Sequence, residues 1–187
     1  MHELAAIPFR RSLDIDWGGL GNASLRLAAD DGLSAMLLKG GRFCEFESFV
    51  ARELLPTAPE PARVHRQGDV TWLWQGPREW LLVSESLDGR ALAERYAAKI
   101  GSLTAAAIDV SDRLLVLELS GPEALALVTK GTSLDPALLS PGACCRTRFA
   151  GLHATLFRPA DAPTYGLIVD RATRVHLHAW LRKVLGA

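Results

Sequence analysis

Residues 108–132, IDVSDRLLVLELSGPEALALVTKGT, bring together the signals for a strand, a turn and a helix, and the remainder of the chain repeats or extends them. Within this stretch Leu114–Leu119 is an apolar run of strand length that only Glu118 interrupts. Nearly continuous apolar runs of this length are typical of strands that are covered on most of both faces. A central strand of a sheet is therefore expected here.

The residues after this strand predict the start of a helix. Ser120 and Glu123 stand three positions apart, with Pro122 between them. This spacing matches a capping box, and proline is tolerated in the first helical turn because its missing N–H would have no partner there. Gly131 offers a left-handed residue at which the helix can end. The buried stripe of the helix is expected to consist of Ala124, Leu125, Leu127 and Val128.

Length and charge limit the class of protein. The chain has 187 residues, with 21 Lys and Arg against 21 Asp and Glu. A chain of this length buries roughly 70% of its unfolded surface, which suits one medium domain or two small fused halves. The balanced charge shows no polybasic face, so nucleic-acid binding is not expected. Because no apolar signal region and no run of about 18 apolar residues occurs, we expect a cytoplasmic protein without a membrane span.

The cysteines and histidines show no spacing typical of a disulfide framework or a metal site. The three cysteines are Cys44 and the adjacent pair Cys144 and Cys145. We expect reduced thiols, and no motif places a base beside Cys144 that would make it a nucleophile. His176 and His178 lie two apart in a predicted helix and so do not face a common ligand point. GxSxG, P-loop and HExxH motifs are also absent from the sequence, so no catalytic, cofactor-binding or metal-binding residues are predicted.

The first half of the chain begins with an arm and continues with strand and helix patterns. Residues 1–21 contain WGGLG, which lacks the GxGxxG spacing, and are interpreted as a connecting arm. Residues 24–40 predict two strands joined as a hairpin by the Asp-Asp-Gly turn at 30–32. Residues 43–55 have the apolar spacing of an amphipathic helix. The proline-rich segment 56–69 is expected to cross the surface without regular structure.

A second hairpin and a second helix are predicted next. Residues 70–84 alternate in the manner of two strands around a Gly-Pro turn. Because side chains alternate along a strand, Trp72 and Trp74 should lie on one face. The following helix is bounded by Asp88 before it and Gly101 after it. Its apolar face is expected to contain Leu92, Tyr96 and Ile100.

The second half of the chain runs through the same order of elements. The turn at residues 30–32 precedes Ser111–Arg113 by about 80 residues, and Leu81–Val83 precedes Leu167–Val169 by about 86. An offset that drifts by only a few residues is the signature of an internal duplication. The sequence therefore predicts a duplicated α+β unit.

This duplication defines the predicted domain organisation. An arm at 1–21 is followed by a first half at 22–100 and a second half at 101–187, which together form one compact domain. Each half is predicted to be of the ββαββα type, with α+β as the fold class. In the second half the predicted strands lie at 146–149, 154–157 and 165–169, and the closing helix at 173–185.

The tryptophans of residues 71–80, TWLWQGPREW, admit two interpretations. They can form a cross-strand aromatic cluster in the core of this domain. Alternatively, Trp72, Trp74 and Trp80 can form a patch that contacts a partner, because tryptophan is enriched at interface hot spots.

Several ordered motifs carry a family resemblance. Trp74–Leu82 has the pattern Trp-x-Gly-Pro-x-Glu-Trp-Leu-Leu. Further pieces are Asp109-Val-Ser-x-Arg113, Leu119-Ser-Gly-Pro122, Lys130-Gly131 with Leu134-Asp135, Gly142-Ala-Cys-Cys-Arg-Thr147, Leu167-Ile-Val-Asp-Arg171 and Trp180-Leu181. Together they resemble the gamma subunit of heterotetrameric sarcosine oxidase. The motif positions that we single out are Gly76, Pro77, Glu79, Gly121, Pro122, Arg146 and Thr147.

The resemblance implies both a fold and membership of an enzyme complex. The fold would be similar to the folate-binding domain of aminomethyltransferase, the T-protein, which is a duplicated α+β arrangement. The partners would be the alpha, beta and delta subunits of a complex that oxidatively demethylates sarcosine to glycine. That complex would use FAD, FMN and NAD, with tetrahydrofolate as the one-carbon acceptor. The resemblance implies that the larger chains hold these cofactors and that this chain binds none.

Two functions are therefore considered. The first is a non-catalytic gamma subunit, without an active site of its own, that stabilises or positions the large flavoprotein chains of the oxidoreductase. The second is a free-standing folate-binding one-carbon transferase or folate sensor, for which Asp109 or Glu118 could hold a pterin ring. T-protein relatives carry an aspartate after the glycine of the hairpin that here contains Gly151, and this chain has Leu152 there. This difference favours the first function.

Overall fold

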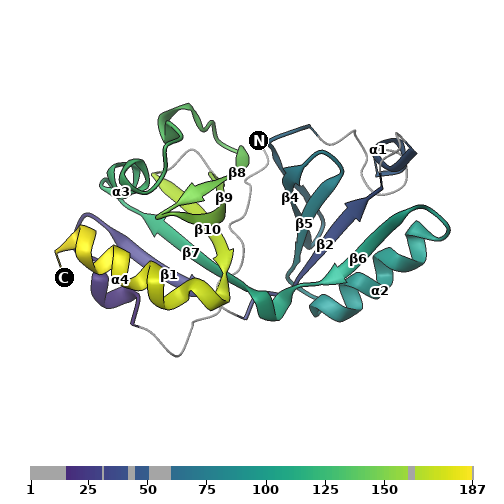
Figure 1. Ribbon diagram of the computed structural model, residues 1–187, viewed down its shortest axis with the longest axis horizontal. Coiled ribbons are helices and arrows are strands. Elements are labelled where there is room, and N and C mark those ends of the chain that lie inside the picture. Colours follow the sequence, from purple (N-terminus) through teal and green to yellow (C-terminus); the bar gives the residue numbers. More distant parts are fainter. Residues whose placement is uncertain (1–15, 31, 42–44, 51–59, 160–162, 187) are drawn as a thin grey trace. The chain divides into compact units, whose positions relative to one another are not determined.

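The computed structural model describes residues 16–30, 32–41, 45–50, 60–159 and 163–186. The chain divides into two compact units (Figure 1). Unit 1 contains the described residues up to Leu33 and from Asp112 onward, and unit 2 is Ser34–Ser111. Each unit is built on its own five-stranded antiparallel sheet.

The sheet of unit 2 has the strand order β3-β4-β5-β2-β6. Its elements are β2 (Ala35–Gly40), α1 (Glu45–Phe49), β3 (Val64–Gln67), β4 (Val70–Gly76), β5 (Glu79–Ser84), α2 (Gly89–Ile100) and β6 (Ala105–Asp109). The predicted second hairpin is confirmed, because β4 pairs with β5 and places Trp74 opposite Trp80. α2 is confirmed as well: the Asp88 carboxylate accepts a hydrogen bond from Ala91 N, and Gly101 ends the helix at a φ of 57°.

Part of the predicted helix at 43–55 is present as α1. Phe46, Phe49 and Val50 are buried in the core of unit 2, as their spacing predicts. Leu54, the next residue of the expected apolar face, lies outside the described residues.

The sheet of unit 1 has the strand order β1-β7-β10-β9-β8. Its elements are β1 (Arg26–Asp30), β7 (Leu114–Ser120), α3 (Ala124–Gly131), β8 (Cys144–Phe149), β9 (Leu152–Phe157), β10 (Thr164–Asp170) and α4 (Arg174–Leu185). β7 lies between β1 and β10, and its leucines at positions 115, 117 and 119 are 0% exposed. The predicted central strand is confirmed.

The core of unit 1 also takes in part of the predicted arm. A short 3-10 helix at Gly18–Leu20 follows Trp17, and both Trp17 and Leu20 are buried in this core. The Trp17 ring meets His178 of α4 edge-on, with ring centroids 5.4 Å apart. This end of the arm is therefore a packed part of unit 1.

The element order confirms the duplication. Each half of the chain runs strand, strand, helix, three strands, helix, from β1 to α2 and from β6 to α4. In the first half the prediction lacked one strand, because β3 lies in the segment expected to have no regular structure. Its sequence VHRQ is mostly polar and lies at the edge of the sheet, so it carries no alternating apolar signal.

The predicted hairpin at residues 24–40 is wrong. Both strands form, but β1 pairs with β7 of unit 1, whereas β2 pairs with β5 and β6 of unit 2. Each half of the sequence thus gives its first strand to the sheet that the other half builds. For this reason the compact units do not coincide with residues 22–100 and 101–187.

The start and end of α3 also differ from the prediction. Ser120 is the last residue of β7, and Glu123 at the N-cap makes no side-chain capping bond, so the predicted capping box is wrong. The helix ends at Thr132 in an extended conformation, and Gly131 is a helical residue instead of a left-handed stop. Of the predicted stripe, Leu125 is 38% exposed, whereas the other three residues are buried.

The longest described helices, α2 and α4, have 12 residues each. None of the described helices combines the length and the apolar character that crossing a membrane requires.

Candidate functional site

The first family motif forms the β4–β5 turn of unit 2. Pro77 precedes Arg78, which has a φ of 61°, so the chain reverses through a left-handed residue. The Arg78 carbonyl accepts a hydrogen bond of 2.8 Å from Gly40 N at the end of β2. The Glu79 carboxylate lies 3.8 Å from Lys39 Nζ. Gly76, Pro77 and Glu79 therefore shape a turn that fixes the end of β2.

The end of β2 is also closely packed against α1. A Cβ atom at Gly40 would overlap the Phe46 ring, which is 3% exposed. Gly41 N donates a hydrogen bond of 2.6 Å to Thr104 O, just before β6. Glycine is required where a ring packs directly on the backbone. The motif turn thus supports the junction of β2, α1 and β6.

The tryptophans of residues 71–80 belong to the core of unit 2. Trp72 is 0% and Trp80 is 4% exposed, and their rings meet edge-on with centroids 6.1 Å apart. Trp72 also meets Tyr96 of α2 edge-on at 5.6 Å. Trp74 is half-buried and packs against the same core, so it shares a face with Trp72 as predicted. The core interpretation therefore holds for Trp72 and Trp80, and the alternative of a partner-facing patch is wrong for these two residues because their rings are covered within the chain.

The second family motif joins β7 to α3 in unit 1. Gly121 has a φ of 112°, and a Cβ atom there would lie 2.5 Å from Ser24 O. Ser24 O accepts a hydrogen bond of 3.1 Å from Glu123 N, and Gly121 N donates one of 3.0 Å to Pro163 O. Gly121 and the exposed Pro122 therefore hold the connection against the segment that leads into β1.

Arg146 and Thr147 lie on β8, the edge strand of unit 1. Arg146 is exposed, whereas Thr147 Oγ1 lies 3.0 Å from Thr132 Oγ1 at the end of α3. Gly131 O accepts a hydrogen bond of 2.8 Å from Ala150 N, and a Cβ atom at Gly131 would overlap the Phe149 ring. The Lys-Gly motif is therefore explained by close packing of α3 on the β8–β9 hairpin.

Two further motifs lie at the end of β6 in unit 2 and at the end of β10 in unit 1. The Asp109 carboxylate accepts hydrogen bonds from Ser111 N at 3.0 Å and Ser111 Oγ at 2.7 Å. Ser111 Oγ in turn accepts a hydrogen bond of 3.0 Å from Ala35 N. In unit 1, Arg113 Nε lies 3.1 Å from Asp170 Oδ2. Asp109, a candidate for holding a pterin, is thus engaged in closing β6 onto β2.

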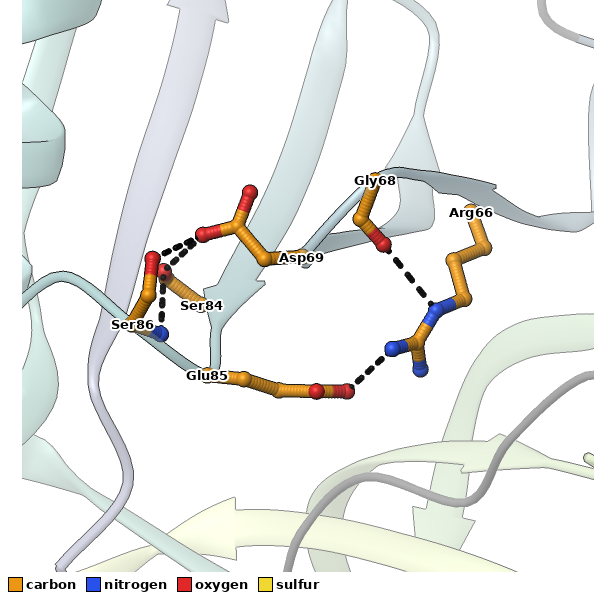
Figure 2. Close-up of polar contacts among 6 residues, drawn as sticks. All are labelled: Arg66, Gly68, Asp69, Ser84, Glu85 and Ser86. Carbon is orange, nitrogen blue, oxygen red and sulfur yellow. Dashed lines mark hydrogen bonds and ion pairs between the residues drawn. The ribbon is translucent and has the colours of Figure 1, made fainter.

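A polar cluster that the motifs did not predict lies at the end of β5 in unit 2. Figure 2 shows the Asp69 carboxylate facing the hydroxyls of Ser84 and Ser86. Asp69 Oδ2 accepts from Ser84 Oγ at 3.3 Å and from Ser86 Oγ. The bond from Ser86 is the main reason why the pKa of Asp69 is lowered. Ser84 Oγ also accepts from Leu87 N at 3.0 Å, so the cluster orders the loop that leads into α2.

An ion pair completes this cluster. Arg66 Nη2 of β3 lies 2.6 Å from Glu85 Oε1, and Arg66 Nε donates to Gly68 O at 3.1 Å (Figure 2). The side chains are 24% and 33% exposed, so the pair is partly shielded from solvent. It connects edge strand β3 to the loop after β5.

Burial raises the pKa of two groups in unit 1. Burial raises the pKa of Glu118 on β7, with the charge of Arg26 opposing it. Burial also raises the pKa of the Cys145 thiol, and Cys144 is fully buried. A raised thiol pKa disfavours the reactive thiolate. Within the described ranges, no group of three or more His, Cys, Asp or Glu side chains is arranged to hold a metal ion.

The motif positions therefore fall into separate groups within unit 1 and unit 2, and each group fixes a turn, a junction or a close packing contact.

The model of the sarcosine oxidase, gamma subunit family matches residues 46–186. The sarcosine oxidase subunit gamma of Corynebacterium sp. (strain P-1) is 31% identical over 112 residues, which cover 58% of this chain and 53% of that protein. The same subunit from Arthrobacter sp. is 32% identical over 97 residues, or 51% of this chain and 47% of that protein. The chain thus spans about half the length of these curated relatives.

Solved structures share the fold. A chain of heterotetrameric sarcosine oxidase from Corynebacterium sp. U-96, in complex with pyrrole 2-carboxylate, matches with a TM-score of 0.74 at 20% identity. The match covers 89% of this chain and 86% of that chain. Aminomethyltransferase T of the glycine cleavage system from Bartonella henselae matches with a TM-score of 0.65 at 12% identity, over 88% of this chain and 47% of that chain. These likenesses confirm the predicted T-protein-like α+β fold. Because the family model covers residues 46–186 of the 187, the chain belongs to the sarcosine oxidase, gamma subunit family.

Proposed function

We propose that this chain is the gamma subunit of a heterotetrameric sarcosine oxidase and that it works in the cytoplasm. The observation that carries the proposal is the family match over residues 46–186. The fold likeness to a chain of a heterotetrameric sarcosine oxidase, over 86% of that chain, supports it. The reaction of the complex would be the oxidative demethylation of sarcosine to glycine, with tetrahydrofolate as the one-carbon acceptor.

The role proposed for this chain is to stabilise or position the larger flavoprotein subunits. The family motifs support this role because the structure gives their residues local structural contacts. Gly121 shapes the turn after β7, and Gly131 allows the Phe149 ring to pack closely on α3. FAD, FMN, NAD and tetrahydrofolate would be held by the larger chains of the complex.

The alternative of a free-standing folate-binding transferase or sensor has weaker support. Its acidic candidates are Asp109, which is bonded to Ser111, and Glu118, whose raised pKa disfavours the carboxylate. A carboxylate that holds a pterin ring through paired hydrogen bonds uses both oxygens and its charge, and Asp109 Oδ1 already accepts two hydrogen bonds from Ser111.

The experiment that tests the proposed function is an omission test. The larger subunits are expressed with and without the tagged chain, and the flavin absorption and sarcosine-dependent peroxide production of each preparation are measured. We expect a yellow, active assembly to be recovered on the tag, and less assembled enzyme when the chain is omitted. Recovery of a colourless chain without the larger subunits would contradict the proposal. Heat released on titration with a reduced folate would then support the alternative.

A further inference from the structure

The charge of the chain is separated along the sequence although its total is balanced. Residues 142–187 contain seven Lys and Arg against two Asp and Glu, a net charge of +5. Subtraction from the totals of 21 and 21 leaves 14 against 19 in residues 1–141, a net charge of −5. The positive segment contains β8, β9, β10 and α4 of unit 1, and cations exposed on these elements can attract a partner of opposite charge.

Helix α4 carries a large part of this positive charge. Its sequence, RVHLHAWLRKVL, has three Lys and Arg, two His and no acidic residue. Leu177 and Leu181 are 0% exposed and anchor one face in the core of unit 1. The opposite face is exposed and consists of Val175, His176, Ala179, Arg182 and Lys183. We name these five residues the α4 outer face.

The α4 outer face combines an uncovered apolar residue with cations. Val175 is 67% exposed, the highest exposure among the large apolar side chains that are exposed in the described part of the chain. Within the described residues, Arg182 and Lys183 form no ion pair or hydrogen bond through their side chains. An apolar centre with polar groups around it is the usual anatomy of a protein interface.

The equivalent helix of the other half shows that this pattern is not a consequence of the fold. α2 also has 12 residues and closes its half of the chain as α4 does. Its Arg90 is paired with Glu94 at 3.0 Å, and Lys99 lies over the Tyr96 ring at 5.5 Å. Arg90 and Lys99 of α2 thus have partners within their own helix, whereas Arg182 and Lys183 of α4 do not.

The positive surface continues from α4 onto the β8–β9 hairpin. His176 Nε2 lies 3.2 Å from Ala150 O, which places this helix beside the hairpin turn. Arg148 and His153 stand opposite each other on the two strands that lead into the turn, and both are exposed. The surface therefore extends beyond a single helix.

We propose that the α4 outer face is the docking surface for an acidic surface of a larger subunit of the sarcosine oxidase complex. This inference rests on the proposed function and assigns a surface to it. The acidic character of the partner follows from charge complementarity, because the side chains of Arg182 and Lys183 form no ion pair among the described residues. Val175 would be covered by apolar groups of the partner, and the cations would set the orientation and the association rate.

The test compares charge reversals on the two equivalent helices. The double variant Arg182→Glu with Lys183→Glu changes the α4 outer face. The double variant Arg95→Glu with Lys99→Glu produces the same change in net charge on α2 and serves as the matched control. Circular dichroism and thermal unfolding of both variants establish that each is folded. Binding of each to the purified larger subunits is then measured at low and at physiological salt.

We expect the α4 variant to bind about tenfold more weakly than the wild type, because two exposed attractions become repulsions. The difference should shrink as salt is added, and the α2 variant should bind like the wild type. Equal binding by the wild type and the α4 variant would overturn this inference but leave the proposed function intact. Failure of the wild type to bind would overturn both. Equally tight binding of the wild type to duplex DNA would overturn the assignment of an acidic protein partner.

Discussion

Replacing Trp72 with alanine tests whether the tryptophans of unit 2 form its core. The side chain is 0% exposed, and its ring meets those of Trp80 and Tyr96 edge-on at 6.1 and 5.6 Å. Truncation removes both contacts and leaves a cavity, and such changes at buried aromatic residues cost about 3–5 kcal/mol. Since folded domains are stable by about 5–15 kcal/mol, this loss is a large part of the total.

The assay is urea unfolding of the purified chain, followed by circular dichroism and by tryptophan fluorescence. Trp74→Ala is the matched control, because Trp74 lies on the same strand and face but is only half-buried. We expect the control to lose about 1–2 kcal/mol, the usual range for partly buried positions. If Trp72→Ala loses no more stability than Trp74→Ala, the indole contributes little to the core and the reasoning is refuted.

Three further changes test local features of the structure. Gly121→Ala should destabilise the chain by about 2 kcal/mol or more, because the residue has a φ of 112° and a Cβ would lie 2.5 Å from Ser24 O; an unchanged unfolding midpoint would contradict this. Asp88→Ala should lower the free energy of unfolding by about 1 kcal/mol, because the hydrogen bond from Ala91 N is lost. Asp88→Asn should retain most of that stability in the same denaturation assay. The folded-state pKa of Glu118 is raised above 4.5 because burial disfavours its carboxylate. The protonated side chain therefore stabilises the fold fully below pH 4.5, and this contribution is lost as the pH rises through the folded-state pKa. Glu118→Gln should therefore gain stability relative to the wild type between pH 4 and pH 8, and urea midpoints that keep a constant difference would contradict the raised pKa.

Elements with complete local signals could be predicted from the sequence. α2 is marked by a capping residue, an apolar period and a terminal glycine, and each of these signals acts within one or two turns. The β4–β5 hairpin is marked by alternation on both sides of a Gly-Pro turn. The duplication was visible for the same reason, because each repeat carries its own local signals at a nearly constant offset.

Pairing between distant strands could not be predicted in this way. The predicted hairpin at residues 24–40 is wrong because alternation identifies strands but not the strands with which they pair. β1 pairs with β7, and its Leu27 is buried in the core of unit 1. β3 was missed because an edge strand with polar side chains has little alternation to detect. The capping box at Ser120 failed because β7 continues through that residue to pair with Thr164.

In the candidate site, too, local sequence signals could be predicted, whereas contacts between distant residues could not. The motif positions were found in the sequence, but their contacts are distant in it: Gly121 meets Ser24, and Arg113 meets Asp170. The Asp69 cluster was not predicted, because Ser84 and Ser86 approach that carboxylate only after β4 and β5 have paired. Exposure of the α4 outer face depends in turn on which side of the helix the core of unit 1 covers.

The mass of the intact assembly tests the central claim most directly. The tagged chain is expressed with the larger sarcosine oxidase subunits, purified in one step on the tag and analysed by native mass spectrometry. We expect one dominant species that contains this chain once together with the alpha, beta and delta chains and their flavins. A preparation in which the chain is recovered alone, while the other subunits assemble into an active enzyme without it, would contradict the account.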